Sequence, residues 1–258
     1  MGVRGRGGRA YDAVIVGAGP NGLAAAATLA EAGRSVLVLE QAAEIGGGAR
    51  SAELTLPGFI HDICSTVHPL GITSPAFRRM PLAAHGLEWV QPPAAVAHPL
   101  DDGRAALLER SVRATAALLG RDGAAYRALF ARLAARWDDL GPEILQPLPH
   151  LPRHPLLLAR FGLPALLPAR ALARLAFRDE PARALFGGIA AHATLSLDEV
   201  PSAAFGFVLG LAGHAVGWPL VRGGSQRLAA ALASYLRALG GEIVTGALVT
   251  DLDQLPPA

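Results

Sequence analysis

The chain has 258 residues, of which 52% are hydrophobic and 17% charged, a composition that excludes a disordered protein and allows a large core. The formal net charge of +2 is too small to indicate nucleic-acid binding by bulk electrostatics. A single cysteine, Cys64, excludes an internal disulfide and indicates the cytoplasm, and no apolar signal segment follows the basic, glycine-rich residues 1–9, which we expect to be flexible.

A glycine motif follows the first apolar run, residues 13–16, which is predicted to form a strand. Gly17, Gly19 and Gly22 have the G-x-G-x-x-G spacing of a dinucleotide-binding turn. Such glycines allow a tight turn, close approach of backbone to a pyrophosphate, and close packing of the next helix on the strand. We predict that helix over residues 20–33, with free N–H groups at its start to bind phosphate.

A second buried parallel strand is predicted over residues 35–39. It ends at Glu40, where this motif places an acid that accepts hydrogen bonds from ribose hydroxyls. A solvated acid at the end of a strand is the alternative interpretation of Glu40. The order strand, helix, strand, acid therefore predicts a dinucleotide-binding βαβ unit.

A second glycine cluster, Gly46 to Gly48, comes directly after this unit. A nicotinamide enzyme has no general need for glycines here, whereas an extended FAD requires backbone to approach its pyrophosphate and ribityl chain. Arg50 can neutralise phosphate or organise the loop; a flexible loop with a surface arginine is the alternative. The cluster favours FAD over NAD as the cofactor.

The segments GAGPNG, VLVLEQAAEIGGGARS and LPGFIHDICSTVHPLG resemble the phytoene dehydrogenase-like family of FAD-dependent oxidoreductases, which includes carotenoid desaturases and is related to the amine oxidases. The resemblance is strong over residues 12–90 and moderate over 220–251. It implies an α/β fold, a Rossmann-like FAD/NAD(P)-binding domain with an inserted α+β substrate domain. It also implies cofactor contacts from Gly17, Gly19, Pro20, Asn21, Gly22, Glu40, Gln41, Gly46, Gly47, Gly48, Arg50 and, near the adenine, Val249.

One departure from the family pattern concerns the second glycine cluster. Relatives carry R-x-G-G-R there, whereas Glu44 and Gly48 stand at the two arginine positions of this chain. We therefore expect the positive charge that faces phosphate to rest on Arg50.

The resemblance implies that residues 59–70 run near the flavin ring, so Ser65, Thr66 and His68 are candidates for lining it. His68 is the one candidate for an acid–base group, because the pKa of histidine lies near neutrality. The alternative is that His68 is hydrogen-bonded and shapes a loop.

The neighbouring polar residues are assigned structural roles. We expect His61 and Asp62 to be polar residues at a strand end, and Cys64 to be a small buried hydrophobic residue. The sequence shows no metal-ligand spacing, no Ser-His-Asp set and no CxxC motif.

The character of the chain changes at about residue 87. Short antiparallel strands are predicted at 88–91, 95–98 and 105–108, and helices at 111–119 and 122–140. In the second helix, apolar side chains at helical spacing predict a stripe that faces the core: Tyr126, Leu129, Phe130, Leu133 and Trp137. Residues 142–155 are rich in proline and are expected to be irregular.

Residues 156–178 are apolar but carry arginines at 160, 170, 174 and 178. The last three recur every four residues, which predicts one basic face on a helix that begins after Pro168. Such a helix can make peripheral contact with an anionic membrane, and an ordinary surface helix is the alternative.

Residues 200–221 carry no charge apart from a possible one on His214, and are long enough to raise a transmembrane interpretation. Prolines and glycines interrupt the segment, so we predict a buried helix that lines an apolar substrate tunnel.

The last part of the chain returns to the cofactor domain. Helix 225–239 is predicted, with Leu228, Leu232 and Leu236 on one face, followed by apolar segments at 242–245 and 247–252. The predicted domains are 1–86 and 221–258 for FAD binding and 87–220 for the mainly helical substrate domain. The resemblance implies a further C-terminal half, so we expect a fragment or a chain that works with a partner chain.

The sequence thus predicts a cytoplasmic FAD-dependent oxidoreductase that moves hydride from an apolar, isoprenoid-like substrate to flavin. Residues 156–178 are a candidate for peripheral contact with a membrane. An amine-oxidase-like enzyme is one alternative. A flavin-binding scaffold without turnover, completed by a partner chain, is another. NAD binding without FAD is the third.

Overall fold

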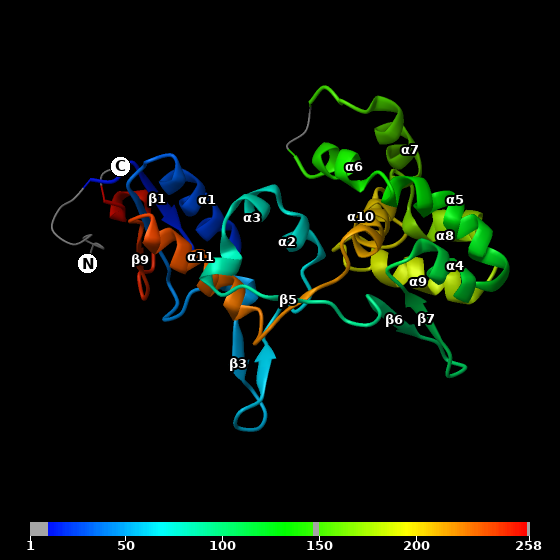
Figure 1. The fold of residues 1–258 in the computed structure, drawn as a ribbon, viewed down its shortest axis with the longest axis horizontal. Helices are drawn as coiled ribbons and strands as arrows, with labels where there is room; N and C mark the ends of the chain where they lie inside the picture. The colour runs from blue at the N-terminus through cyan, green and yellow to red at the C-terminus, as the bar shows by residue number, and fades with distance from the viewer. Residues whose placement is uncertain (1–9, 147–149, 257–258) are drawn as a thin grey trace. The chain divides into compact units, whose positions relative to one another are not determined.

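The computed structural model describes residues 10–146 and 150–256 (Figure 1), so the terminus predicted to be flexible, 1–9, lies outside the described residues. The chain divides into two units, of residues 1–68, 75–90 and 220–258, and of residues 69–74 and 91–219. Each unit is described by itself below. The domain limits proposed from the sequence stay a prediction.

The first unit is built on a parallel sheet. Strand β1 (Ala13–Val16) pairs with β2 (Val36–Leu39), and β2 pairs on its other edge with β9 (Glu242–Val244), which gives the order β1-β2-β9. Helix α1 (Pro20–Glu31) joins β1 to β2, so the predicted βαβ unit is confirmed. Every residue of β2 is buried, because this strand is central in the sheet and covered on both faces.

Helix α11 (Gln226–Ala238) packs against α1, and Figure 1 shows the two side by side. The predicted stripe of Leu228, Leu232 and Leu236 is fully buried in this layer. Alanines on α1 allow the close approach of the two helices; Ala26, Ala27 and Ala30 are all buried. The opposite face of the sheet is covered by a smaller cluster of Tyr11, Leu37, Leu39 and Ala247.

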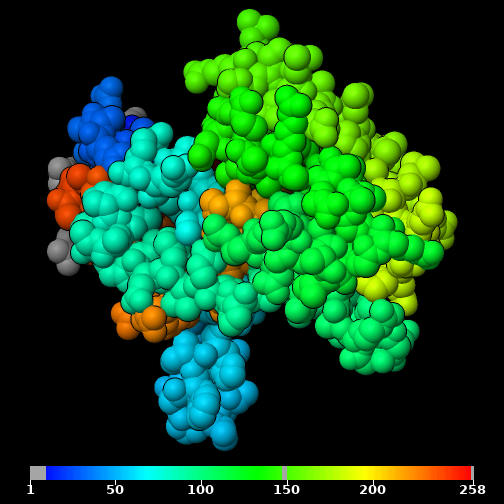
Figure 2. Space-filling view, turned by 45° about the vertical axis from the view of Figure 1, so that its right-hand side comes forward, coloured from blue at the N-terminus to red at the C-terminus, as the bar shows by residue number. Residues whose placement is uncertain are grey.

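The rest of the first unit consists of short elements: η2 (Gly47–Ala49), β3 (Ser51–Glu53), β4 (Ile60–Asp62), α3 (Pro75–Arg79), η3 (Leu82–His85), β5 (Trp89–Val90), β8 (Leu220–Val221) and η5 (Leu252–Gln254). The antiparallel β3–β4 hairpin, coloured light blue, projects from this unit in Figure 2. Several of its apolar side chains are exposed: Leu54, Leu56, Phe59 and Ile60.

The expectation that Cys64 is buried was wrong. Cys64 lies in the segment that follows this hairpin, and its side chain is exposed.

The second unit is mainly helical. It contains α2 (Pro69–Thr73), the hairpin β6 (Val96–Pro99) and β7 (Ala105–Leu108), α4 (Val112–Leu118), η4 (Gly120–Asp122), α5 (Gly123–Ala134), α6 (Trp137–Ile144), α7 (Pro155–Ala165), α8 (Ala169–Ala176), α9 (Glu180–Ala190) and α10 (Ser202–Ala215). The hairpin confirms two predicted strands.

Two expectations about these helices require correction. The predicted helix 122–140 is broken into α5 and α6 at Ala135 and Arg136, although the predicted apolar stripe still faces the core. The predicted basic face over 170, 174 and 178 is shorter than expected. Helix α8 ends at Ala176, and the backbone amide of Arg178 is instead held by the carboxylate of Asp122.

Helix α10 lies in the centre of the second unit and packs against α5, α7, α8 and α9. Its Phe207 is fully buried in a cluster with Phe130, Phe161 and Phe186. This confirms the buried helix predicted within 200–221, while its role in a substrate tunnel stays a prediction. In the described part of the chain no single helix could cross a membrane by length and composition; α7 and α8 pass that test only together, across a bend of 99°.

Candidate functional site

The first glycine loop ends β1 and opens α1 with backbone groups alone. Gly17 has a φ of 101°, in the region that favours glycine. A Cβ on Gly22 would lie 2.1 Å from the carbonyl oxygen of Gly17, so helix and loop touch only because Gly22 lacks a side chain. The N-cap of α1 is Gly19, which makes no side-chain capping bond. The first amides of the helix are therefore open to an anion.

The second glycine cluster lies directly on the first. The amide of Gly46 donates to the carbonyl oxygen of Ala18 at 2.8 Å. A Cβ on Gly47 would lie 3.1 Å from the Cα of Gly19, so two backbones meet there without side chains between them. Both Gly46 and Gly47 have positive φ angles, 122° and 52°. The two clusters, separate in sequence, form one surface of backbone atoms.

Glu40 connects the carboxyl end of β2 with the first glycine loop. The residue is only 8% exposed. One carboxylate oxygen accepts the amide of Ala18 at 2.7 Å and the other accepts the amide of Ala42 at 2.9 Å. Glu40 is therefore not a solvated acid. Each carboxylate oxygen has a second lone pair that can accept a hydrogen bond from a ribose hydroxyl.

Arg50 makes a side-chain hydrogen bond within the second glycine cluster. Its Nε donates to the carbonyl oxygen of Gly47 at 3.0 Å, a bond that organises the loop. The remaining guanidinium nitrogens are donors suited to a phosphate oxygen. Of the two roles weighed for Arg50, the loop-organising one is present in the structure, and the phosphate contact stays a prediction.

The other predicted cofactor residues fall at the same edge of the sheet. Asn21 and Gln41 are exposed at the start of α1 and just after β2. Val249 packs on the cluster behind the sheet, two residues beyond Ala247, whose amide donates to the carbonyl oxygen of Glu40 at 2.8 Å. The fold thus gathers the predicted residues at the carboxyl ends of β1 and β2, the edge where open parallel sheets bind ligands.

Sequence reasoning missed Gln226 and Ser225 at the start of α11. The side-chain amide of Gln226 donates to the carbonyl oxygen of Ile45 at 2.9 Å, and its backbone amide donates to Oγ of Ser51. These bonds hold the second glycine cluster against α11. The signal available in the sequence was the Gly223-Gly224 pair before the helix. Both residues have positive φ angles, a conformation that favours glycine.

Asp62 joins the β3–β4 hairpin to the start of α11. One oxygen accepts the hydroxyl of Ser51 at 2.6 Å and the backbone amide of Ser225 at 2.7 Å. Partial burial alone would raise the pKa of Asp62, but these hydrogen bonds outweigh it and hold the pKa below its usual value. Its neighbour His61 contacts Thr55 instead, so the two are polar residues at a strand end, as predicted.

His68 is half-buried and its Nε2 lies 2.8 Å from Oγ of Ser225. The Ser225 hydroxyl donates its one proton to the carbonyl oxygen of Ser65 at 2.7 Å, so His68 is the donor of the first bond and carries its proton on Nε2. Burial lowers the pKa of His68, against an opposing effect of the Asp62 charge, so the ring is neutral at pH 7. The hydrogen-bonded alternative for His68 is therefore present, and an acid–base role stays a prediction.

This site fits the adenosine and pyrophosphate half of a dinucleotide. Open amides at the start of α1, a side-chain-free surface and a buried acid at the end of β2 are what that half requires. Among the described residues no group of three or more His, Cys, Asp or Glu side chains could hold a metal ion.

Three comparisons with known proteins agree with this geometry. Residues 15–80 match the family described as "NAD(P)-binding Rossmann-like domain". A stretch of 132 residues, 50% of this chain, is 32% identical to a subunit of limonene dehydrogenase from Castellaniella defragrans and covers 24% of that protein. The pyridine nucleotide-disulfide oxidoreductase domain-containing protein 2 of Rattus norvegicus is 29% identical over 91% of this chain and 47% of its own length.

Among solved structures, putrescine oxidase bound to putrescine superposes with a TM-score of 0.56 at 23% sequence identity, covering 92% of this chain and 51% of the oxidase. At that identity the likeness concerns the fold. The predicted α/β fold, a Rossmann-like FAD/NAD(P)-binding domain with an inserted α+β domain, is confirmed. The chain spans about half the length, or less, of the relatives it matches.

Proposed function

We propose that this chain carries the adenosine and pyrophosphate part of the cofactor site of an FAD-dependent oxidoreductase. The observation that supports the proposal best is the backbone contact of Gly47 with Gly19. A nicotinamide cofactor is bound by the first glycine loop and its helix, whereas the second loop enlarges the side-chain-free surface beside it, as the backbone approach to an extended FAD requires.

The residues assigned to FAD follow from this geometry. The amides at the start of α1 would hold the pyrophosphate, Glu40 the adenosine ribose, and Arg50 a phosphate oxygen through its free guanidinium nitrogens. FAD, when bound, supplies a hydride acceptor. The protein's own part is to orient the cofactor and exclude water, and Glu40 fixes the loop that does so through the Ala18 amide.

A titration of the purified full chain tests the cofactor. We expect a flavin absorption spectrum as purified or after adding FAD, and tighter binding of FAD than of NAD or NADP by isothermal titration calorimetry. Binding of NAD tighter than FAD would overturn the choice of cofactor. If the chain binds none of FAD, NAD and NADP, the proposed cofactor site itself is overturned.

For the substrate we propose an apolar, isoprenoid-like molecule. The similarity to a limonene dehydrogenase subunit supports a hydrocarbon of this kind. The second unit also supports it, because its interior is a cluster of phenylalanines around α10, and its two buried acids, Asp122 and Glu143, are both used to bind backbone amides.

An amine-oxidase-like activity is the second candidate, favoured by the shared fold with putrescine oxidase. Anaerobic mixing of the FAD-loaded chain with a cyclic monoterpene or with a diamine separates the two candidates, because only a substrate bleaches the flavin spectrum. We expect bleaching by the monoterpene. Bleaching by the diamine alone would replace the proposal with the second candidate.

A partner chain belongs to the same proposal, since the similar limonene dehydrogenase protein is named as one subunit of its enzyme. If the chain binds FAD but its flavin is bleached by neither compound, the scaffold alternative is favoured, and the bleaching test is repeated with a candidate partner chain added.

A further inference from the structure

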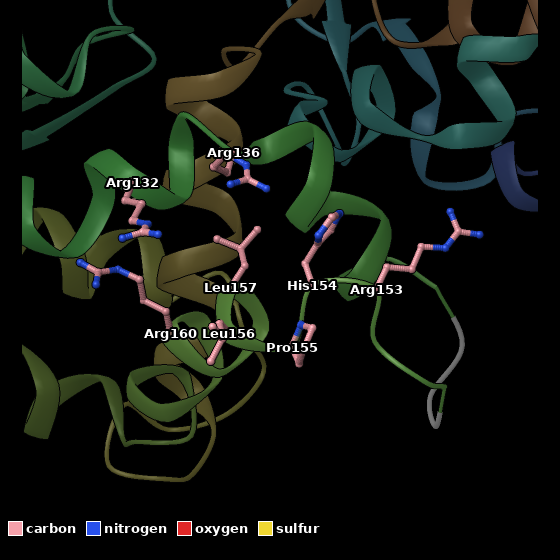
Figure 3. A pocket seen from close by; sticks show the side chains of 8 residues that line it. All are labelled: Arg132, Arg136, Arg153, His154, Pro155, Leu156, Leu157 and Arg160. Carbon is pink, nitrogen blue, oxygen red and sulfur yellow. The ribbon is translucent and has the colours of Figure 1, made fainter.

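A pocket of about 530 Å³ lies in the second unit, where α5, α6 and α7 meet (Figure 3). Four of the residues that line it are arginines: Arg132, Arg136, Arg153 and Arg160. The chain uses arginine for all 23 of its basic residues, and the guanidinium fork binds phosphate oxygens in pairs. The pocket is therefore suited to an anion.

Two of the arginines converge on one place. Arg160 donates from Nη2 to the carbonyl oxygen of Ala128 at 3.1 Å, and Ala128 lies one helical turn from Arg132 on the same face of α5. Figure 3 shows the side chains of Arg132 and Arg160 pointing toward one another. Like charges repel, so an anion between them would stabilise this arrangement.

Little negative charge offsets these arginines. Arg136 pairs with Asp139, and His154 lies 3.5 Å from the same carboxylate. Within the described ranges, 10–146 and 150–256, no carboxylate pairs with the guanidinium of Arg132, Arg153 or Arg160. The pocket thus keeps an excess of positive charge.

The far wall of the pocket is fixed in place. The buried carboxylate of Glu143 accepts the backbone amides of Arg153 and His154 at 2.7 and 3.1 Å and contacts Nε2 of His150 at 2.8 Å. The hydrogen bond to His150, followed by those to the two amides, outweighs desolvation and holds the pKa of Glu143 below its usual value. The wall is held by hydrogen bonds and does not depend on a ligand.

Exposed leucines surround these charges. On α7, Leu156 and Leu163 are 86% and 73% exposed and lie on one face with Arg160 between them, at spacings of four and three residues. Leu151 and Leu166 are also exposed. The opposite face of α7 packs inward through Leu157, Phe161 and Ala165. This face of α7 therefore offers a guanidinium group that can bind a lipid headgroup, flanked by leucines that can enter the boundary of the acyl chains.

We propose that this surface, the arginine pocket with the leucine face of α7, binds the phosphates of anionic lipids at the surface of a bilayer. A free phosphate or a soluble organic anion would use the arginines but would leave the leucines exposed to water. A bilayer uses both, because the leucines enter the boundary of the acyl chains while the guanidinium groups bind headgroups.

Vesicle flotation of the full chain tests the proposal. We expect flotation with phosphatidylcholine vesicles that contain phosphatidylglycerol, weaker flotation with phosphatidylcholine alone, and loss of binding as salt is raised. The double variant Arg132→Gln/Arg160→Gln should lower the partition coefficient by about 10- to 30-fold, from roughly 1 kcal/mol for each charge near the surface.

Matched controls separate the site from bulk charge. Arg78→Gln/Arg113→Gln removes the same charge at exposed positions outside the pocket, and should leave flotation nearly unchanged. Leu156→Gln/Leu163→Gln should reduce flotation while keeping all arginines. All the substituted residues are exposed on the surface. Unchanged far-UV circular dichroism and thermal melting would show that each variant folds.

Four results would overturn the proposal. The first is equal flotation on neutral and anionic vesicles. The second is an equal loss in both arginine double variants. The third is binding of inorganic phosphate that depends on Arg132 and Arg160 while no vesicle binds, which would assign the pocket to a soluble anion. A leucine variant that turns a dimer into a monomer, without vesicle binding by the parent, would assign the surface to a second copy.

Discussion

The carboxylate of Glu40, at the end of β2, accepts the backbone amide of Ala18 at 2.7 Å inside the first glycine loop. This bond joins the two elements that a dinucleotide has to touch together, the ribose-binding acid and the pyrophosphate-binding turn. Glu40 therefore acts on the loop even before a ligand binds, in addition to any contact with ribose.

Replacement of Glu40 tests both roles. Glu40→Ala leaves the buried amide of Ala18 without its acceptor, so we expect a loss of about 1–3 kcal/mol in unfolding free energy and a loss of similar size in FAD affinity. Urea unfolding of the cofactor-free chain and calorimetric titration with FAD measure the two separately. Unchanged stability with weaker FAD binding would restrict Glu40 to the ribose contact, and two unchanged values would contradict both roles.

Gly19 offers a way to fill the cofactor surface without disturbing the fold. Its φ of −73° suits any residue, and a Cβ there would lie 3.8 Å from the Cα of Gly47, an ordinary contact. We expect Gly19→Ala to keep the stability of the free chain and to lower FAD affinity at least about tenfold, because the methyl group occupies the path of the pyrophosphate. The control is Gly162→Ala, on α7 in open space. Full FAD affinity in Gly19→Ala would contradict this placement of the cofactor.

The burial of His214 should make the free energy of unfolding depend on pH. Tyr126 donates to its Nε2 at 2.7 Å, its Nδ1 faces the carbonyl oxygen of Arg110, and burial lowers its pKa to about 4. The unfolded chain, with a pKa near 6.5, binds more protons between these values. Neutral, buried His214 therefore contributes to the free energy of unfolding. This contribution is complete above about pH 6.5, and about 3 kcal/mol of it is lost as pH falls toward 4.

The comparison that isolates this effect uses His214→Gln, which does not titrate. Urea unfolding followed by circular dichroism between pH 4 and 7 should show a steeper loss of stability in the parent than in the variant. Other titrating groups contribute to both chains and cancel in the difference. Equal slopes would show that His214 is not buried in its neutral form.

Gly210 of α10 lies in the tightly packed centre of the second unit, where one added methyl group should lower the stability of the chain. A Cβ on Gly210 would lie 2.9 Å from the ring of Phe130, which is fully buried and stacked on Tyr126. We expect Gly210→Ala to lower the unfolding free energy by about 1–3 kcal/mol through overpacking, despite the higher helix propensity of alanine. Thermal melting checks this, and Gly162→Ala, where nothing lies within 4 Å, should be neutral or stabilising.

The sequence alone was sufficient for the elements of the cofactor unit. Local patterns determine them: the glycine spacing, the apolar run of β2 and the leucine stripe of α11 each correspond to one element in the structure. The same holds for the β6–β7 hairpin, which forms where two short antiparallel strands were predicted.

Contacts between distant segments could not be predicted in this way. The approach of Gly47 to Gly19, and the bonds from Gln226 to Ile45 and Ser51, depend on how α11 returns to the sheet. The exposure of Cys64 is likewise not marked by any local pattern in the sequence. The break between α5 and α6 has no proline or glycine at Ala135 and Arg136 to mark it.

The sheet of the first unit also determines an order of events during synthesis. Leu37 on β2 pairs with Glu242 on β9, so one edge of the central strand stays open until β9 has left the ribosome. The second unit, residues 91–219 apart from one short segment, is complete before that point. Since contacts distant in sequence form slowly and domains fold as units, we expect the helical unit to fold first and β9 to complete the sheet of the first unit last.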